Sequence, residues 1–223
     1  MFSDRHPMYE KLRTLKGVIY IIEGIIGVGK TTLGNSLEHY LNNVSLKCKF
    51  FKEYFNESLL NQFIGNMGSY AYFFQMMMLV KRIEIYREAE EFSKLGGISF
   101  IDRSLIGDMT FAKMHYLNKN ISEDEWKIYN NFIKDENLFT PSACIYLKCN
   151  TEISMDRVKN RGLTSEITGY DSDYITKLKD MYDSVISSTT NVKIITLNWD
   201  KSIILKDNMI SEYDILEIIN LLL

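Results

Sequence analysis

One motif near the start of the chain limits what it can fold into more than any other feature. Residues 24–31 read Gly-Ile-Ile-Gly-Val-Gly-Lys-Thr and fit the pattern G-x-x-x-x-G-K-T. They directly follow the apolar run 18–23, and leucines at 33, 37 and 41 after them have helical spacing. A strand, a glycine-rich loop and a helix in this order are typical of the phosphate-binding loop of nucleotide-using proteins. The motif therefore predicts an α/β fold in which a helix N-terminus meets phosphates.

The residue types in this loop match the chemistry of a polyphosphate. Glycines let several backbone N–H groups approach one anion without obstruction by a side chain. Lys30 supplies a positive charge for the β- and γ-phosphates, and the Thr31 hydroxyl can ligate Mg²⁺. The residues expected to bind a nucleoside triphosphate here are Gly24, Gly27, Val28, Gly29, Lys30, Thr31 and Thr32.

The rest of the chain alternates between short strand-like runs and longer helical patterns. The further strand-like runs are Cys48–Lys52, Ile98–Asp102, Cys144–Lys148 and Lys193–Leu197. This alternation predicts a P-loop NTPase-type three-layer α/β fold, with a five-stranded parallel sheet flanked by helices and ligands at the carboxyl ends of the strands. We expect a single domain over residues 18–223, preceded by a polar lead-in at 1–17.

Composition argues against several classes of protein. The formal net charge is -3 and the basic residues are dispersed, so we expect no binding to nucleic acid or membranes. No apolar stretch approaches the roughly 20 residues that span a bilayer. The three cysteines show neither C-x-x-C nor zinc-ligand spacing, which favours reduced thiols in a cytoplasmic protein.

Several local patterns predict individual helices. Residues 69–92 are one long helix candidate, with Phe73, Val80 and Ile83 among the apolar residues of a face that could line a pocket. Two further helical patterns are expected within 116–139, around a capping box formed by Ser122 and Glu125.

A helix is also expected after the fourth strand-like run. Asn150 is the predicted N-cap of this helix, which runs toward Arg161 and Gly162. Arg157 and Arg161 lie four residues apart on it, so both guanidinium groups can project from one face. We interpret residues 157–170 as a short basic lid that closes over phosphates.

Polar residues follow two of the predicted strands at the edge where the phosphate loop lies. Glu53 after the second strand could accept a proton from an attacking hydroxyl. Asp102 could orient water bound to Mg²⁺, and Arg103 could hold the oxygens of a transferring phosphate. Together with Lys30, these side chains predict a site for phosphoryl transfer.

The ordered set of motifs resembles the deoxyribonucleoside kinase family, the relatives of deoxycytidine, deoxyguanosine and mitochondrial thymidine kinases. The resemblance spans roughly residues 18–197. It rests on Glu23-Gly24, Glu53, Phe73-Phe74-Gln75 with Arg82, Asp102-Arg103-Ser104 with Asp108, and the arginines Arg157 and Arg161.

The resemblance implies an ATP- and Mg²⁺-dependent kinase of nucleotide salvage that phosphorylates the 5′-hydroxyl of a deoxyribonucleoside, favours deoxycytidine or deoxypurines over thymidine, and forms a homodimer. The catalytic residues would be Lys30, Glu53 as the base, and Arg103. The substrate would be bound by Phe74 and Gln75 at the nucleobase, with Arg82 and Asp108 paired at the back of that pocket. Glu53 and Arg103 would lie at the 5′-hydroxyl, and Glu166 near the sugar 3′-hydroxyl. Arg157 and Arg161 would contact the donor, and Thr31 and Asp102 would hold the metal.

The chain departs from the family pattern around the acceptor. Tyr54 and Ser58 stand where the family has a proline and a tryptophan, which alters one wall of the base pocket. Ile64 replaces a tyrosine expected at the sugar 3′-hydroxyl, and Leu163 replaces a basic lid residue. Two other functions stay open at this point: a thymidylate-type nucleoside monophosphate kinase, and a P-loop ATPase or switch protein.

Overall fold

A parallel sheet of five strands forms the centre of the molecule. The computed structural model describes residues 12, 14–136, 138, 140–200 and 209–223, so most of the lead-in at 1–17 lies outside the described residues. The strand order is β2-β3-β1-β4-β5, with every neighbouring pair parallel. Its strands are β1 (Val18–Glu23), β2 (Cys48–Phe51), β3 (Ile98–Asp102), β4 (Ala143–Lys148) and β5 (Ile194–Asn198). The predicted strands are confirmed to within one residue at each end.

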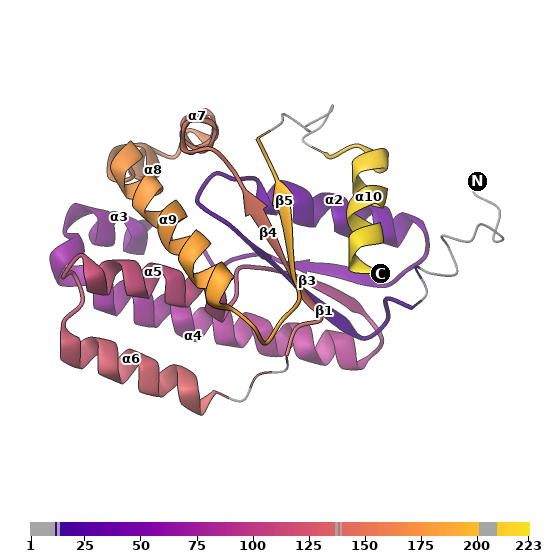
Figure 1. Ribbon diagram of the computed structural model, residues 1–223, viewed down its shortest axis with the longest axis horizontal. Coiled ribbons are helices and arrows are strands. Elements are labelled where there is room, and N and C mark those ends of the chain that lie inside the picture. Colours follow the sequence, from indigo (N-terminus) through magenta and orange to yellow (C-terminus); the bar gives the residue numbers. More distant parts are fainter. Residues whose placement is uncertain (1–11, 13, 137, 139, 201–208) are drawn as a thin grey trace.

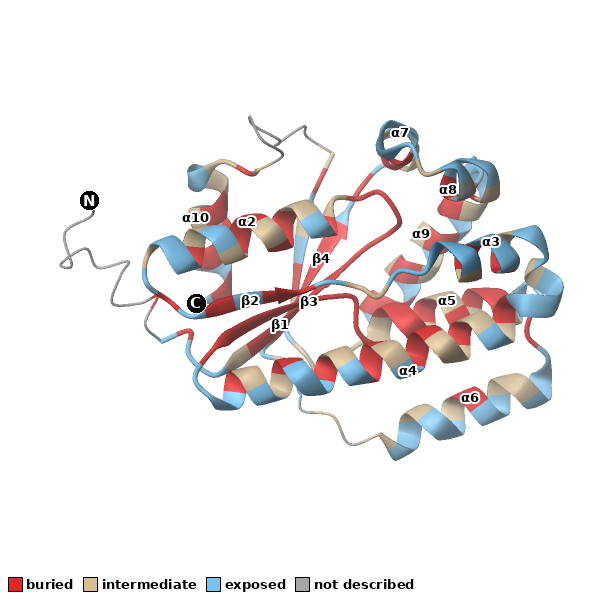
Figure 2. Cartoon of the chain, turned by 180° about the vertical axis from the view of Figure 1, so that it is seen from behind, coloured by how far each residue is buried: buried red, intermediate tan, exposed pale blue. Residues whose placement is uncertain are grey.

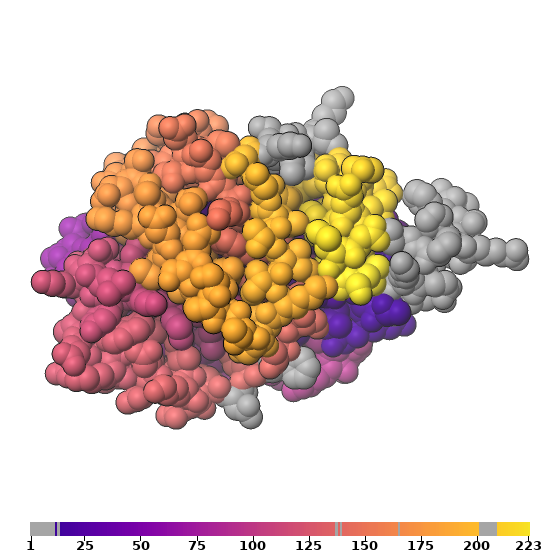
Figure 3. Space-filling view, viewed as in Figure 1, coloured from indigo at the N-terminus to yellow at the C-terminus, as the bar shows by residue number. Residues whose placement is uncertain are grey.

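Helices cover both faces of this sheet and complete the predicted three-layer fold (Figure 1). They are α2 (Lys30–Asn43), α3 (Glu57–Gly65), α4 (Met67–Lys94), α5 (Leu105–Leu117), α6 (Glu123–Asp135), α7 (Thr151–Arg161), α8 (Thr164–Gly169), α9 (Ser172–Ser188) and α10 (Glu212–Leu222). In the space-filling view, α9, β5 and α10 form the orange and yellow surface that hides most of the sheet on this side (Figure 3).

Two of the helix predictions are confirmed by their caps. The side chain of Ser122 accepts from the backbone N–H of Glu125, and the side chain of Glu125 accepts from the backbone N–H of Ser122. The expected capping box is therefore present at the start of α6. Asn150 accepts from the N–H of Glu152 and caps α7.

The prediction of two helices within residues 116–139 is wrong. Only α6 lies there in full, because α5 already begins at Leu105 and ends at Leu117. The signal for this earlier start is Ser104, whose hydroxyl accepts from the backbone N–H of Ile106. This N-cap lies inside the Asp102-Arg103-Ser104 motif, so one short segment both begins a helix and supplies polar groups to the site.

The expected buried face of α4 also needs correction. Phe73 and Val80 are exposed, by 52% and 38%, and only Ile83 of the three is buried. The buried side of α4 instead contains polar residues, including Gln75 and Arg82, as the alternating burial colours along the helix show (Figure 2). The hydrophobic pattern fails here because a helix that lines a polar site must bury polar side chains.

The sheet order places the phosphate loop at the strand from which the sheet is extended first to one side and then to the other. From β1 the chain adds β2 and β3 on one side, and then β4 and β5 on the other. In open parallel sheets, ligands bind at such a switch point, beyond the carboxyl ends of the strands. The loop between β1 and α2 lies at this edge, next to the residues that follow β2 and β3. None of the described helices combines the length and the apolar character needed to cross a membrane.

A buried histidine makes the stability of this fold depend on pH. His115 in α5 is 1% exposed, and its ring nitrogens lie 3.3 Å from the Asn120 amide and 3.3 Å from the Tyr174 hydroxyl. Burial lowers the pKa of His115 from 6.5 to about 4. Between these two values the unfolded chain binds a proton that the folded chain excludes, so stability falls as the pH drops through this window.

We expect His115→Gln to flatten the acid side of the stability profile. Between pH 7 and pH 5 the wild type should lose about 2 kcal/mol of unfolding free energy through His115 alone, and this loss should be absent in the variant. Urea titrations at the two pH values measure the difference. His39→Gln, at an exposed position on α2, is the matched control. Equal pH slopes for wild type and His115→Gln would contradict the assignment.

Candidate active site

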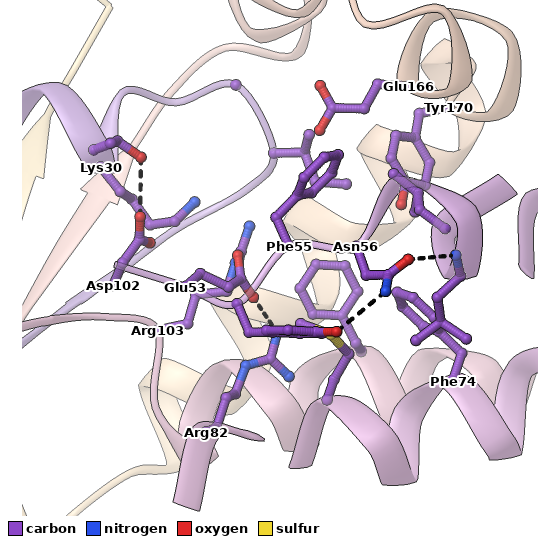
Figure 4. A pocket seen from close by; sticks show the side chains of 18 of the residues that line it. Lys30, Glu53, Phe55, Asn56, Phe74, Arg82, Asp102, Arg103, Glu166 and Tyr170 are labelled. Carbon is purple, nitrogen blue, oxygen red and sulfur yellow. Dashed lines mark hydrogen bonds and ion pairs between the residues drawn. The ribbon is translucent and has the colours of Figure 1, made fainter. Parts of the chain in front are cut away.

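A cavity lies at the carboxyl edge of the sheet and brings the predicted site residues together. Its walls come from the phosphate loop, the segments after β2 and β3, and the helices α3, α4, α5, α7 and α8. Figure 4 shows Glu53, Asp102 and Arg103 on one side of this space, Phe74 on the other, and Glu166 and Tyr170 entering from α8.

The phosphate loop has the backbone conformation that its glycines predict. Gly27 has φ of 73°, and a Cβ atom there would lie 2.7 Å from the carbonyl oxygen of Ser154. Gly29 has φ of 108° and forms the N-cap of α2. Both positions therefore favour glycine for their left-handed backbone, and Gly27 also requires it for close packing against α7.

Lys30 lies buried inside this loop. Its ammonium group donates to the carbonyl oxygens of Gly24 at 3.3 Å and Ile25 at 3.1 Å. Burial, followed by repulsion from Arg103, lowers the pKa of Lys30 to about 8. A bound phosphate would favour the charged form, because an opposite charge at close range raises the pKa of an ammonium group.

Thr31 and Asp102 form an oxygen-rich pair beside the loop. The Thr31 hydroxyl donates to Oδ2 of Asp102 at 3.0 Å. Oδ1 of Asp102 is buried and has no hydrogen-bond partner among the described residues. Burial raises the pKa of Asp102, and Lys30 acts against it. An unpartnered carboxylate oxygen next to a hydroxyl suits Mg²⁺, which binds through carboxylates, hydroxyls and phosphate oxygens.

Glu53 lies between two buried arginines. Its carboxylate accepts from Nε of Arg103 at 3.0 Å and forms an ion pair with Arg82. Burial alone would raise the pKa of Glu53, but Arg103, Arg82 and Lys30 outweigh it and lower the pKa to about 2. At this pKa the carboxylate is ionised at neutral pH. Because 26% of the side chain is exposed, it is also accessible from the cavity.

Arg103 is held in place from three directions. Besides Glu53, its guanidinium donates to the carbonyl oxygen of Gly24 at 2.8 Å and to the hydroxyl of Tyr182. The residue has φ of 68°, a left-handed conformation that a non-glycine residue adopts at a cost of about 1 kcal/mol or more. Strained backbone of this kind is concentrated at functional sites.

A buried carboxylate behind Arg103 braces the same region. Glu23 is fully buried, and its Oε1 accepts from the backbone N–H groups of Ser104 at 2.7 Å and Gly107 at 3.0 Å. Its Oε2 accepts from the Tyr182 hydroxyl at 3.1 Å. Glu23 and Tyr182 therefore join β1, the start of α5 and α9 around Arg103.

A fully buried carboxylate lies behind the end of the cavity that is away from the phosphate loop. Asp108 is paired with Arg82 and accepts from the Gln75 amide at 2.9 Å and the Tyr129 hydroxyl at 2.6 Å. The predicted pairing of Arg82 with Asp108 is therefore present. Phe74 lines the same end of the cavity and stacks on Phe63, with 4.4 Å between ring centroids.

The two arginines predicted for the lid differ in their positions. Arg157 donates to the carbonyl oxygens of Val28 at 2.8 Å and Trp199 at 3.0 Å, so it braces the phosphate loop against the segment after β5. Arg161 lines the cavity and donates to both carboxylate oxygens of Glu166 at 3.0 Å. The predicted lid, residues 157–170, is the second half of α7 followed by α8.

The four departures from the family pattern lie in different surroundings. Tyr54 lines the cavity and its hydroxyl accepts from the Asn56 amide at 3.2 Å, whereas Ser58 is exposed on α3. Ile64 packs against the backbone of Gly169, and Leu163 precedes the first turn of α8.

Sequence reasoning did not identify several residues of this site. Three tyrosines have no local motif that marks them. They are Tyr129 on α6, Tyr170 directly after α8, and Tyr182 on α9. Glu23 was noticed only as the residue before the loop. Its place at the end of a buried strand was the one available signal, since a charged residue there must find partners.

Known proteins resemble this chain in sequence and in fold. The sequence model of a family described as deoxynucleoside kinase matches residues 20–223. Deoxyadenosine kinase of Dictyostelium discoideum is 25% identical over 194 residues, covering 85% of this chain and 75% of the relative. Deoxyadenosine kinase of Lactobacillus acidophilus is 24% identical over 193 residues, covering 82% and 86%. The structure of deoxyadenosine kinase from M. mycoides with bound dATP has a TM-score of 0.72 at 21% identity and covers 91% of this chain and 97% of that one.

Proposed function

The chain belongs to the deoxynucleoside kinase family, and we propose that it transfers the γ-phosphate of ATP, or of another nucleoside triphosphate, to the 5′-hydroxyl of a 2′-deoxyribonucleoside. As a member of this family it is a kinase that phosphorylates nucleosides. One observation carries the proposal: a single cavity joins the phosphate loop at Lys30 to Gln75 and Arg82, which Asp108 holds from behind. Glu53 and Arg103 lie between these two ends.

The residues divide the reaction between them. Glu53 accepts the proton of the 5′-hydroxyl as its oxygen forms a bond to the γ-phosphorus. The bond from that phosphorus to the bridging oxygen breaks, and the nucleoside diphosphate leaves with the electron pair. Arg103, Lys30 and Arg161 neutralise charge on the phosphoryl oxygens, which is the main contribution of a protein to this chemistry.

Thr31 and Asp102 would hold Mg²⁺. The unpartnered Oδ1 of Asp102 and the adjacent hydroxyl provide the oxygen ligands that this ion prefers. When bound, the ion would neutralise negative charge on the donor phosphates.

The acceptor end favours bases that have an exocyclic amino group. Gln75 and Arg82 line the cavity, and the carboxylate of Asp108 is buried directly behind them, where it holds both side chains and places a negative charge at this end. Cytosine and adenine both present an amino donor next to a ring-nitrogen acceptor, which complements this pair. Thymine presents an oxygen acceptor in place of the amino group, which the negative charge of Asp108 behind Gln75 and Arg82 disfavours. We therefore propose deoxycytidine and deoxyadenosine as better substrates than thymidine. The M. mycoides enzyme, which has this fold, is known with dATP and with dCTP bound.

A substrate panel tests this function. With ATP and Mg²⁺, we expect kcat/KM for deoxyadenosine and deoxycytidine to exceed that for thymidine by roughly 10²-fold, the cost of unpaired buried polar groups. The panel also contains deoxyguanosine, adenosine, dAMP and TMP. Faster phosphorylation of the monophosphates would favour a monophosphate kinase. Rapid ATP hydrolysis without any acceptor would favour an ATPase.

The homodimer, the cytoplasmic location and the role in nucleotide salvage also belong to the proposal. Support for a dimer comes from large apolar side chains exposed on two helices, Phe73 and Val80 of α4 and Ile128 and Phe132 of α6. Support for a reducing compartment comes from the cysteines, each of which is free and buried.

A further inference from the structure

We propose that Tyr170, at the end of the lid helix α8, holds the 3′-hydroxyl of the substrate sugar together with Glu166. The family pattern has a tyrosine for this hydroxyl on α3, where this chain has Ile64. The inference rests on the proposed function and names a residue that selects the sugar within the same site.

Ile64 has no means of binding a sugar hydroxyl in this structure. Its side chain is apolar and packs against the lid backbone, where a Cβ atom added to Gly169 would lie 2.4 Å from Cγ2 of Ile64. This close contact requires the glycine and brings α3 and the end of α8 together. The residue after that glycine is Tyr170, so the same contact that occupies Ile64 also places Tyr170 at the cavity wall.

The hydroxyl of Tyr170 has no hydrogen-bond partner among the described residues, although only 5% of the residue is exposed. Its ring is held by stacking on Tyr174, with 4.9 Å between centroids. Figure 4 shows its phenol entering the pocket from the same side as the Glu166 carboxylate, opposite Arg82. A buried phenol normally bonds to another polar group, so this one is placed to meet a group of the substrate.

Tyr170 and Glu166 together match the bonding capacity of one hydroxyl group. Burial, then Tyr174, Glu166 and Glu53, raise the pKa of Tyr170 well above its usual value, so the phenol stays protonated and can donate. The carboxylate of Glu166 is an acceptor, and the residue is 7% exposed. A sugar hydroxyl accepts from the first and donates to the second. Glu53, Glu166 and Tyr170 line the same cavity, so a sugar held by Glu166 and Tyr170 lies in the space that also contains the proposed base.

The test compares two substrates that differ by one oxygen. We expect the wild type to prefer 2′-deoxyadenosine over 2′,3′-dideoxyadenosine by roughly 10- to 100-fold in kcat/KM, because the second leaves the buried phenol without a partner and removes a donor to Glu166. In Tyr170→Phe this preference should shrink by about tenfold. The change should come from slower use of 2′-deoxyadenosine, with 2′,3′-dideoxyadenosine used at an unchanged rate.

Tyr174→Phe is the matched control, because it also removes a single phenol hydroxyl. That hydroxyl lies against His115, while the ring that stacks on Tyr170 is kept. It should retain the wild-type preference. The phenol oxygen of Tyr170 has no hydrogen-bond partner in the part of the chain that the structure describes, so Tyr170→Phe should also melt at the wild-type temperature. Equal losses on both substrates in Tyr170→Phe would overturn the inference, and so would a wild type indifferent to the 3′-hydroxyl. If neither substrate is phosphorylated by the wild type, the proposed function itself fails.

Discussion

Replacing Glu53 by Gln lowers kcat for phosphorylation of 2′-deoxyadenosine by roughly 10²- to 10⁴-fold, the usual contribution of a general base. The amide of Gln keeps the shape of the side chain and an oxygen that accepts hydrogen bonds, but it cannot take the proton of the 5′-hydroxyl. The loss should therefore appear in kcat, with a smaller change in KM. Steady-state assays with saturating ATP and Mg²⁺ measure both constants.

The control for this variant must separate catalysis from structure, since Glu53 also pairs with Arg82 and Arg103. Glu57→Gln changes an exposed carboxylate four residues further along, in the first turn of α3, and should leave kcat unchanged. Thermal melting of each variant shows whether the fold is intact. A Glu53→Gln variant that melts normally and keeps near wild-type kcat would show that Glu53 is not the base.

The low pKa of Glu53 adds a pH test of the same assignment. With its pKa lowered to about 2, the carboxylate of the free enzyme remains ionised as the pH falls through its ordinary range near 4.5. The kcat/KM profile for the nucleoside reports groups of the free enzyme. We therefore expect no loss of kcat/KM from protonation of Glu53 between pH 7 and pH 5.

Replacing Arg103 by Ala lowers kcat by roughly 10³-fold, comparable to the loss of an arginine that stabilises a transferring phosphoryl group. The guanidinium is buried beside Glu53 and the phosphate loop, where water cannot replace its charge. Ala is preferred to Gly because a non-glycine residue at φ of 68° retains the strain of the backbone. The same kinetic assay measures the loss.

Chemical rescue distinguishes this role from a merely structural one. Guanidinium ions added to Arg103→Ala should restore part of the lost rate by occupying the space left beside Glu53. Arg87→Ala removes an arginine that is exposed and paired with Glu136, and its rate should not respond to guanidinium. If Arg103→Ala has near wild-type kcat in the absence of guanidinium, the assignment is wrong.

Much of this site could be predicted because its residues lie next to local motifs. The phosphate loop has its own spacing, and Glu53 and Asp102-Arg103 follow recognisable strands. Carboxyl ends of parallel strands meet at one edge, so finding the strands was enough to bring these residues together. The roles of Gln75, Arg82 and Asp108 came only from resemblance to a family, since nothing in the periodicity of α4 indicates that polar residues are buried.

The residues that escaped prediction reach the site from distant parts of the chain. Tyr182 contacts Arg103 across 79 positions, and Tyr129 contacts Asp108 from a separate helix. Aromatic residues on amphipathic helices are ordinarily core residues, and only the packing of α6 and α9 shows that these hydroxyls point at buried charges. The same reason explains the incorrect face of α4.

The sequence alone determined the order of the strands along the chain, the phosphate loop, and the chemical character of the catalytic edge. These depend on short-range demands: glycines for a left-handed loop, apolar runs for buried strands, and charges where strands end. Only the tertiary structure decided which side chains face one another across the cavity. It put Ile64 against Gly169 and left the hydroxyl of Tyr170 at the cavity wall, because those positions follow from how α3 and α8 pack. Packing of this kind joins residues more than 100 positions apart, and no local pattern records it.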